Sequence, residues 1–301
     1  MIPGRIRRFF KSEPDPAVQA AAYAATRLER IRKYVTKEQA GLEIGPSLRP
    51  CAPKKEGYRV EIIDHMDREA LVAKYEAMGL DTSAIEEVDY IWKGTSYTEL
   101  TGKRNYYDYC IASHVIEHAP DFIGFLSDIS CMLKDGGVLS LAVPDKRYTL
   151  DHFRTVTGTG KMVDDHLLPD RLGSPGTLID YGLHVVRRDS RTSWSRAEDR
   201  ALPAGYEKVF EHAELRDIYD KTIAHPGYHD IHQYVFTPAS FRLLIKELLA
   251  MRFIDMDIDT LYDTETEEFI VLMRKTSQPV LLSPEEHFAL CRLVSRENVI
   301  A

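Results

Sequence analysis

The sequence predicts an α/β fold whose core is a mostly parallel β-sheet. Short apolar runs alternate with helical periodicity between residues 41 and 143, a pattern typical of βαβ units with right-handed crossovers. Two later apolar runs, 252–258 and 268–273, are joined by a short acidic linker. Because so short a connection cannot make a parallel crossover, we expect these two strands to be antiparallel. The sheet should therefore end in an antiparallel pair.

The remaining elements follow from the spacing of apolar residues. Residues 17–35 place them on one helical stripe, which predicts an amphipathic helix. Strands are expected where apolar residues run without helical spacing, at 41–44, 58–64, 85–89, 109–112 and 138–143. Helices are expected where they recur every three or four positions, at 67–78, 121–133 and 238–250, and Gly79 should end the first of these.

These elements divide the chain into four segments. We expect an N-terminal helical extension over residues 1–37 and a ligand-binding core over 38–150. The alternation stops after Pro144, and the loop-rich stretch 151–235 holds seven of the eleven histidines. We interpret it as an α-rich insertion that covers the ligand, with the end of the sheet and a C-terminal helix in 236–301.

Composition narrows the class of protein. The chain has 39 Lys and Arg against 47 Asp and Glu, a net charge of −8, which argues against a dedicated nucleic-acid-binding protein. It has neither an apolar run of membrane-spanning length nor the apolar core of a secretion signal. The four cysteines show no metal-type pairing, so we expect reduced thiols and a cytoplasmic protein without an integral membrane segment.

Polar and glycine residues follow the predicted strands at one edge of the sheet. Open α/β sheets bind ligands at the carboxyl ends of their strands. The candidates at this edge are Glu43, Gly45, Pro46 and Ser47 after the first strand, Asp64, Asp89, Ser113 with His114, and Asp145. Five such features in register are a stronger signal than any one of them, because single glycines and caps are common at strand ends.

The spacing also indicates which ligand is bound. Asp64 lies 21 residues beyond Glu43, where an acid can accept hydrogen bonds from both ribose hydroxyls. The intervening loop 45–50 has one glycine and two prolines, a poor cradle for a pyrophosphate. It suits a nucleoside without phosphates, such as S-adenosylmethionine. The alternative is a plain strand–turn–helix junction with Glu43 as a satisfied core acid.

At this point the sequence resembles class I S-adenosylmethionine-dependent methyltransferases, whose sheet is Rossmann-like and ends in an antiparallel pair. The motifs that resemble the family are 42–47, 62–64, 111–118, 133–137 and 141–148, in order over roughly residues 38–150. The resemblance implies Glu43 and Gly45 near the methionine moiety, Asp64 on the ribose and Asp89 beside the adenine. It also implies that Ser113 or His114 lines the sulfonium side.

A narrower similarity concerns the acceptor of the methyl group. Residues 143–154 and 234–241 are similar to methyltransferases encoded with bacterial surface-polysaccharide (O-antigen or capsule) and glycosylation enzymes. This resemblance suggests O-methylation of a sugar, nucleotide-sugar or glycan hydroxyl. An N-methyltransferase or one acting on a small metabolite would share the same cofactor half. A non-catalytic nucleoside-binding protein and a nicotinamide-dependent enzyme are also compatible with the fold, and a homo-oligomer is left open.

A sugar hydroxyl is a weak nucleophile, so we expect a base, and histidine suits this role near neutral pH. The candidates are His152, His229 and His232, with Asp145 or Asp230 positioning the base or the acceptor. His225, His229, Asp230 and His232 also crowd into eight residues, which is compatible with a metal. We favour a base and expect no metal, because no flanking pattern completes a coordination sphere.

Cations near the fifth strand suggest an anionic acceptor. Lys146, Arg147 and Arg154 are candidates to bind a phosphate or carboxylate, and the alternative is a solvated loop in which Asp145 caps a turn. Glu117 and His118 are expected to orient or cap a helix, and we exclude them from catalysis.

Overall fold

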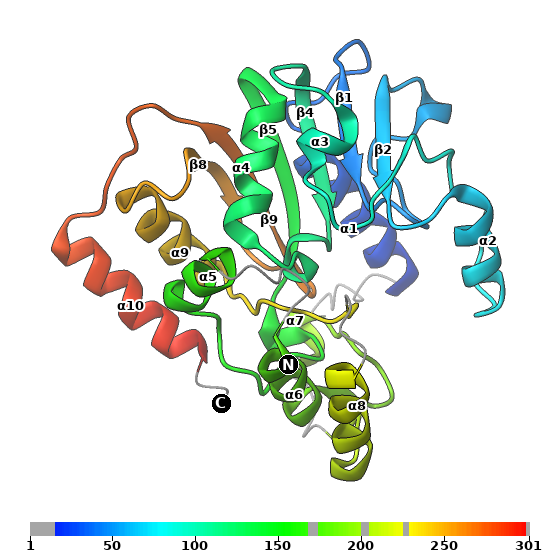
Figure 1. The fold of residues 1–301 in the computed structure, drawn as a ribbon, viewed down its shortest axis with the longest axis vertical. Helices are drawn as coiled ribbons and strands as arrows, with labels where there is room; N and C mark the ends of the chain where they lie inside the picture. Colours follow the sequence, from blue (N-terminus) through cyan, green and yellow to red (C-terminus); the bar gives the residue numbers. More distant parts are fainter. Residues whose placement is uncertain (1–15, 168–173, 200–204, 225–228, 299–301) are drawn as a thin grey trace, which may run out of the picture.

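The computed structural model describes residues 16–167, 174–199, 205–224 and 229–298, and its core is a seven-stranded sheet (Figure 1). The strands lie in the order β3-β2-β1-β4-β5-β9-β8. Their bounds are β1 (Gly41–Ile44), β2 (Val60–Asp64), β3 (Tyr90–Ile91), β4 (Tyr107–Ser113), β5 (Leu133–Pro144), β8 (Met256–Tyr262) and β9 (Glu268–Lys275). The first five pair in parallel, whereas β9 runs antiparallel to β5 and β8. The predicted fold class, with its terminal antiparallel pair, is confirmed.

Helices cover both faces of the sheet because its strands are apolar on both sides. Neighbouring residues of β4 point to opposite faces, so Cys110 and Ala112 join one core cluster and Tyr109 and Ile111 the other. The first cluster includes Phe122 and other side chains of α4 and α9, and the second contains Ile31 of α1. The helices of this part are α1 (Pro16–Ile31), α2 (Arg68–Glu76), α3 (Tyr97–Thr101), α4 (Phe122–Met132), α9 (Pro238–Ala250) and α10 (Pro284–Asn298).

The segment between β5 and α9 contains α5 (Thr159–Leu167), α6 (Pro175–His184), α7 (Arg196–Asp199), α8 (His212–Ala224) and a small antiparallel pair, β6 (Val186–Arg188) with β7 (Tyr206–Lys208). Helices α6, α7 and α8 lie below the sheet in Figure 1, whereas α5 packs against α4 and α9. Helices α6 and α8 pack together where Leu215 fits over Gly182, whose added Cβ would lie 2.1 Å from the Leu215 Cδ2. The described part of the insertion is thus rich in helix, as expected.

Several boundaries differ from the sequence prediction. The third strand is not 85–89: β3 covers only Tyr90–Ile91, so Asp89 precedes this strand instead of ending it. The α3 helix was not expected, although Ser96 caps it by accepting a hydrogen bond from the backbone N–H of Glu99. The penultimate strand starts at Met256, because residues after α9 turn through Arg252 at φ +61° before the strand begins.

The carboxyl ends of four parallel strands meet at one edge of the sheet. Ile44 of β1 is in register with both Ile63 of β2 and Ala112 of β4, and Ser113 pairs with Ala142 of β5. The segments that follow these strands are therefore neighbours, which brings the predicted polar residues to one place.

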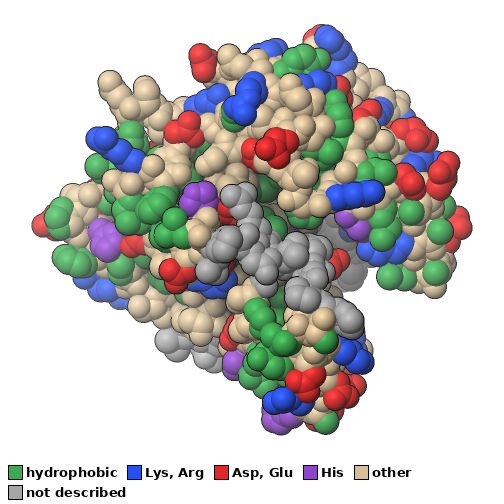
Figure 2. Space-filling model, in the orientation of Figure 1, with side chains coloured by type: hydrophobic (Ala, Val, Ile, Leu, Met, Phe, Trp, Pro, Cys, Tyr) green, Lys and Arg blue, Asp and Glu red, His purple; other side chains and the backbone are tan. Residues whose placement is uncertain are grey.

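Charged side chains of both signs are mixed on the surface. On the face drawn in Figure 2, basic and acidic side chains are interspersed, and the coloured side chains there do not gather into one continuous basic area. None of the helices in the described parts of the chain has the length and apolar character needed to cross a bilayer.

Gly41 is required by the close pairing of β1 and β4. A Cβ at this position would lie 2.0 Å from Cζ of the buried Tyr109 ring on the neighbouring strand. We expect Gly41→Ala to lower the free energy of unfolding by about 1 to 3 kcal/mol, the usual cost of overpacking a core. Urea denaturation checks this, with Gly158→Ala as the control because its Cβ would meet nothing within 4 Å. Equal losses in the two variants would contradict the steric argument.

Candidate active site

The loop after β1 is folded back onto the sheet by Glu43. The two carboxylate oxygens of Glu43 accept hydrogen bonds from the backbone N–H groups of Cys51 (2.6 Å) and Ala52 (2.9 Å). Burial raises the pKa of Glu43 to about 7, against the lowering effect of these two bonds. Both oxygens are used inside the protein, so the role of Glu43 in this structure is to shape the loop.

Gly45 and Ser47 give that loop its sharp path. Both have positive φ angles, +61° and +47°, and a Cβ on Gly45 would lie 3.0 Å from the Val115 side chain. The Gly45 N–H donates to the Ile63 carbonyl (2.8 Å), and the carbonyl of Pro46 accepts from Arg49 N–H (2.9 Å). The single glycine thus keeps backbone, and no side chain, at the carboxyl end of β1.

Asp64 is the last residue of β2, and only one of its two carboxylate oxygens is hydrogen-bonded within the described part of the chain. Its Oδ1 accepts a hydrogen bond from the backbone N–H of His65 (2.7 Å) and contacts the His65 Nδ1 (2.6 Å). Its Oδ2 is buried and has no hydrogen-bond donor among the described residues. A buried polar atom without a partner is costly, and a ribose hydroxyl would satisfy this one. The structure therefore leaves an acceptor where the sequence predicted ribose binding.

The Asp89 carboxylate makes its hydrogen bonds within the protein. Its Oδ2 accepts from the backbone N–H of Ile62 (2.7 Å) and from Lys54 Nζ (2.5 Å), so it ties the start of β3 to β2. The residue that directly follows β3 is Trp92, whose N–H donates to the Asp64 carbonyl (2.8 Å). The predicted contact of Asp89 with adenine stays a prediction.

A buried carboxylate on β9 joins the two predicted residues after β4. Glu268, only 2 % exposed, accepts from Arg27 of α1 through both oxygens (2.5 and 3.1 Å) and from the Tyr23 hydroxyl (2.9 Å). The same Glu268 contacts His114 Nε2 at 2.8 Å, and Arg27 donates to the Ser113 hydroxyl at 2.6 Å. Helix α1 is thereby held against the candidate cofactor site.

This contact sets the charge of His114. Burial lowers the pKa of His114, but the nearby carboxylates of Glu117 and Glu268 outweigh it and raise the pKa to about 10. Burial likewise raises the pKa of Glu268, yet His114 and Arg27 bring it down to about 2. The pair is therefore ionised at neutral pH, and His114 cannot act there as a base.

A second cluster lies beside the first, in the turn after β4. Glu117 and His118 belong to the short helix η2 (Ile116–His118), and His232 comes from the segment before α9. The rings of His118 and His232 meet edge to face with centroids 4.7 Å apart. Asp151 contacts His232 Nδ1 at 2.5 Å, and Asp230 contacts His118 Nδ1 at 3.0 Å. Two predicted residues, His232 and Asp230, thus meet here with three that were not predicted to act.

The side chains after β5 are engaged with one another. Asp145 caps the short helix η3 (Lys146–Tyr148): its oxygens accept from Arg147 N–H (3.0 Å), the Arg147 guanidinium (2.6 Å) and the Thr264 hydroxyl (2.6 Å). Lys146 is 2 % exposed, and this burial lowers its pKa to about 8. Arg147 also pairs with Glu297 at 3.5 Å. The turn-cap alternative describes Asp145 well, and contact of Lys146 and Arg147 with an acceptor stays a prediction.

His152 and Arg154 are likewise held inside the insertion. His152 Nδ1 contacts the Arg147 carbonyl oxygen (2.7 Å), and its Nε2 contacts the Tyr206 hydroxyl (2.9 Å). Arg154 is 3 % exposed and donates to Asp151 at 2.8 Å. With both nitrogens engaged, His152 is a poorer candidate for the base than His232.

The histidine-rich loop is described only in part. His229 has a buried Nε2 without a hydrogen bond among the described residues, and Asp230 reaches His118. His225, the other histidine of this loop, lies outside the residues that the structure describes. The loop therefore contributes His232 and Asp230 to the cluster, and the role of His229 stays a prediction.

Sequence reasoning missed Glu268, Arg27, Glu117 and Asp151 as parts of the site. Glu268 is an acid at the start of an apolar strand, where a charged residue has to find a partner, and this signal was available in the sequence. For Arg27 no local signal existed, because Glu268 is 241 positions away, and the pairing of Asp151 with His232 spans 81 positions.

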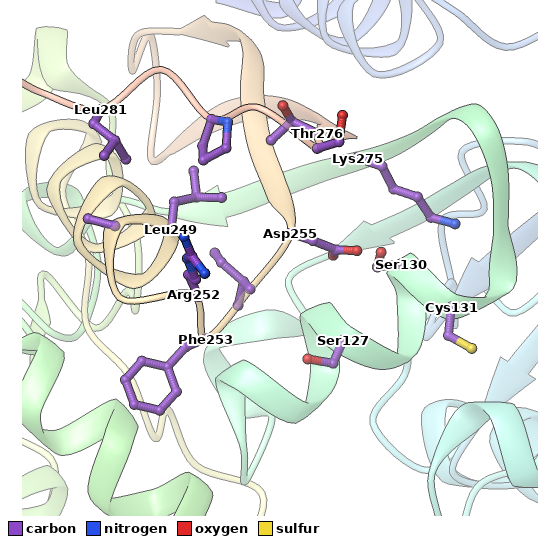
Figure 3. A pocket seen from close by; sticks show the side chains of 14 residues that line it. Ser127, Ser130, Cys131, Leu249, Arg252, Phe253, Asp255, Lys275, Thr276 and Leu281 are labelled. Carbon is purple, nitrogen blue, oxygen red and sulfur yellow. The ribbon is translucent and has the colours of Figure 1, made fainter.

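A cavity lies at the other end of the sheet (Figure 3). Its walls come from α4 (Ser127, Cys131), the turn after α9 (Phe253, Asp255) and the end of β9 (Lys275). Because β9 is antiparallel, its carboxyl end lies at the amino edge of the parallel strands. This cavity is separate from the candidate active site.

Comparison with known proteins identifies the family of this chain. Residues 19–169 match the model of a family described as a methyltransferase domain, which is half of the chain. The chain belongs to this methyltransferase family. The predicted enzyme class and its cofactor, S-adenosylmethionine, are thereby confirmed. No curated protein matches the sequence.

Solved structures with a similar chain path show low sequence identity. A putative Zn-dependent alcohol dehydrogenase from Rhodobacter sphaeroides is 12 % identical, with 83 % of this chain and 89 % of that chain covered and a TM-score of 0.43. A SAM-dependent methyltransferase from Methanosarcina mazei is 14 % identical, with 84 % and 97 % covered and a TM-score of 0.42. A putative S-adenosylmethionine-dependent methyltransferase from Listeria monocytogenes is 13 % identical, with 84 % and 100 % covered and a TM-score of 0.39.

The buried pair of Glu268 and Arg27 should contribute measurably to stability. We expect Glu268→Gln to lower the free energy of unfolding by about 2 kcal/mol, less than for a fully buried pair because Arg27 and His114 reach solvent. Urea denaturation measures the loss, with Glu265→Gln as the control because Glu265 is exposed and pairs with Arg30 at the surface.

The loss should depend on pH in a defined way. His114 has its pKa raised from 6.5 to about 10, so its stabilisation is complete below 6.5 and disappears as the pH rises through 10. Glu268 has its pKa lowered from 4.5 to about 2, so its share is present above 4.5. The difference between wild type and Glu268→Gln should be largest between pH 4.5 and 6.5. A difference that grows toward high pH would contradict this assignment.

Proposed function

We propose that this methyltransferase transfers the methyl group to an oxygen, and that the acceptor is a sugar hydroxyl of a bacterial glycan pathway. The observation that supports O-methylation best is the His232–Asp151 pair beside His118 and Glu117, at the carboxyl edge of β4 and β5. A sugar hydroxyl is weakly acidic and needs a base to take its proton, whereas an amine acceptor can lose its proton to water.

The cofactor fits the residues at the ends of β1 and β2. Asp64 offers its unpaired, buried Oδ2 to the ribose, and Gly45 keeps side chains away from the loop backbone. S-adenosylmethionine supplies an electrophilic methyl group on its sulfonium. Ser113 and His114 are proposed to line that side, where Glu268 sets the orientation and charge of His114.

His232 is proposed as the base. The 2.5 Å contact of Asp151 with Nδ1 orients the imidazole and leaves Nε2 for the acceptor proton. Asp151 is itself held by Arg154 at 2.8 Å, so the ring has little freedom to turn. Placing donor and hydroxyl in line supplies most of the remaining acceleration, because the reaction is a direct displacement.

The sugar acceptor rests on the similarity of residues 143–154 and 234–241 to polysaccharide and glycosylation methyltransferases. Among the cations proposed to contact an anionic acceptor, Arg147 is the most accessible, with 20 % of its side chain exposed. Lys146 and Arg154 are buried and would act only after a rearrangement. An N-methyltransferase or one acting on a small metabolite is the second candidate, since the cofactor half is the same.

Asp64→Asn should weaken cofactor binding. Loss of a charged acceptor for the ribose hydroxyls costs about 1.5 to 3 kcal/mol, or roughly 10- to 100-fold in Kd. Calorimetric titration with S-adenosylmethionine and S-adenosylhomocysteine measures this, with Asp135→Asn, an exposed position, as the control. Unchanged affinity in Asp64→Asn would remove Asp64 from the site, and failure of the wild type to bind either nucleoside would overturn the proposal.

His232→Gln should separate turnover from binding. We expect affinity for S-adenosylmethionine within about twofold of wild type, and a turnover lower by roughly 10² to 10⁴-fold. Turnover is measured as S-adenosylhomocysteine formed with a panel of nucleotide sugars, glycans, amines and small metabolites. His184→Gln, an exposed histidine of α6, is the matched control. Activity on amines alone would favour the second candidate function, and full activity of His232→Gln would exclude His232 as the base.

A further inference from the structure

Three side chains with metal-ligand chemistry converge in the cluster after β4. Glu117, His118 and His232 each offer one ligand atom, and these atoms all lie within 4.8 Å of one another. Two imidazoles and one carboxylate form a set that suits divalent transition metals and leaves coordination positions open. The set is not apparent in the sequence, because His232 lies more than a hundred residues beyond the first two.

The buried carboxylate of Glu117 independently indicates a bound cation. Glu117 is 0 % exposed, and neither of its oxygens has a hydrogen-bond donor among the described residues. Its nearest cationic contacts are imidazoles, His114 Nδ1 at 3.5 Å and His118 Nε2 at 3.9 Å. A buried carboxylate without hydrogen bonds is expensive unless it is paired or binds a metal. The His114 imidazolium offsets part of this cost, and a metal ion between Glu117 and the two histidines would bind the carboxylate directly.

His232 is already oriented as a metal-ligating histidine usually is, because Asp151 holds its Nδ1 by a hydrogen bond. Ligating histidines commonly use their second nitrogen in this way, which fixes the ring and strengthens the first nitrogen as a donor to the metal. The Asp230 carboxylate lies 3.0 Å from His118 Nδ1 as an ion pair without hydrogen-bond geometry. Both Nε2 atoms are then left for a metal.

The backbone holds the two segments together without a metal. The Glu117 carbonyl oxygen accepts from the N–H groups of Gln233 (2.7 Å) and Tyr234 (3.2 Å). Glu117 and His232 are therefore held close in the folded chain, and the site is largely formed before any ion enters.

We propose that Glu117, His118 and His232 bind one divalent transition metal ion, with Asp151 and Asp230 as the outer carboxylates. The binding itself does not depend on the proposed function. Its catalytic consequence rests on that function: an acceptor hydroxyl on an open coordination position would become more acidic. His232 would then serve as a ligand, and the acidified hydroxyl would give its proton to water as its oxygen takes the methyl group and the donor sulfonium leaves as a neutral thioether.

The test uses the full chain, stripped with a chelator and then titrated with Co²⁺ or Zn²⁺ alone. We expect one ion per chain, a visible Co²⁺ absorption band typical of bound nitrogen and oxygen ligands, and a higher Tm in the presence of the ion. His232→Gln and Glu117→Gln should each lose the band and the Tm shift. Asp151→Asn should keep the site with an affinity lower by roughly 10- to 100-fold. His184→Gln, which lies outside the cluster, should bind like wild type.

Two outcomes overturn the proposal: a wild-type chain that binds no ion, or variants of Glu117 and His232 that bind as tightly as wild type. Circular dichroism and S-adenosylmethionine binding on the same samples show that each variant is folded. These readouts also separate the two proposals. If the chain binds the ion but methylates no hydroxyl acceptor, the metal site is supported and the proposed O-methylation is rejected. If the chain methylates a hydroxyl but binds no ion, the O-methylation is supported and the metal site is rejected.

Discussion

The site depends on one buried carboxylate, that of Glu268. It stands at the start of β9, the strand inserted antiparallel between β5 and β8, and it meets Arg27 from the first helix and His114 from the turn after β4. Segments separated by more than 240 positions are thereby joined at the sheet edge. Without a carboxylate there, Arg27 and His114 would lose their shared partner, and α1 and the turn that leads to Glu117 would lose the contact that joins them.

Three more carboxylates are buried at the same edge of the sheet. Glu43, Glu117 and Asp151 are all nearly inaccessible, and each is compensated differently. Backbone N–H groups satisfy Glu43, whereas His232 and Arg154 satisfy Asp151. Glu117 has only neighbouring imidazoles. Burial would raise the pKa of Glu117, but His114, His118 and His232 hold it below its usual value. Such incompletely satisfied charge is typical of functional sites, where binding of a ligand completes the set.

The prediction worked where local pattern and geometry coincide. The position of Asp64 at the end of β2 was predicted correctly, because the apolar run before it marks the strand, and the parallel register brings that end beside Gly45. The prediction failed at β3, since a strand of two residues has no periodicity to detect, and Asp89 was placed on its wrong side. His152 and Asp145 were candidates by position, but both contact Arg147, and the distant Tyr206 and Thr264 complete their contacts in the folded chain.

The sequence by itself determined the α/β class, the antiparallel ending and the sheet edge at which the polar candidate residues gather. Hydrophobic periodicity and connection length are local properties, and they constrain topology directly. Only the tertiary structure decided which side chains act together. Glu117, His118 and His232 form one cluster because two backbone hydrogen bonds bring distant segments into contact, and Asp151 then orients the His232 ring. Contacts of that kind follow from how the insertion folds over the sheet, which no spacing along the chain records.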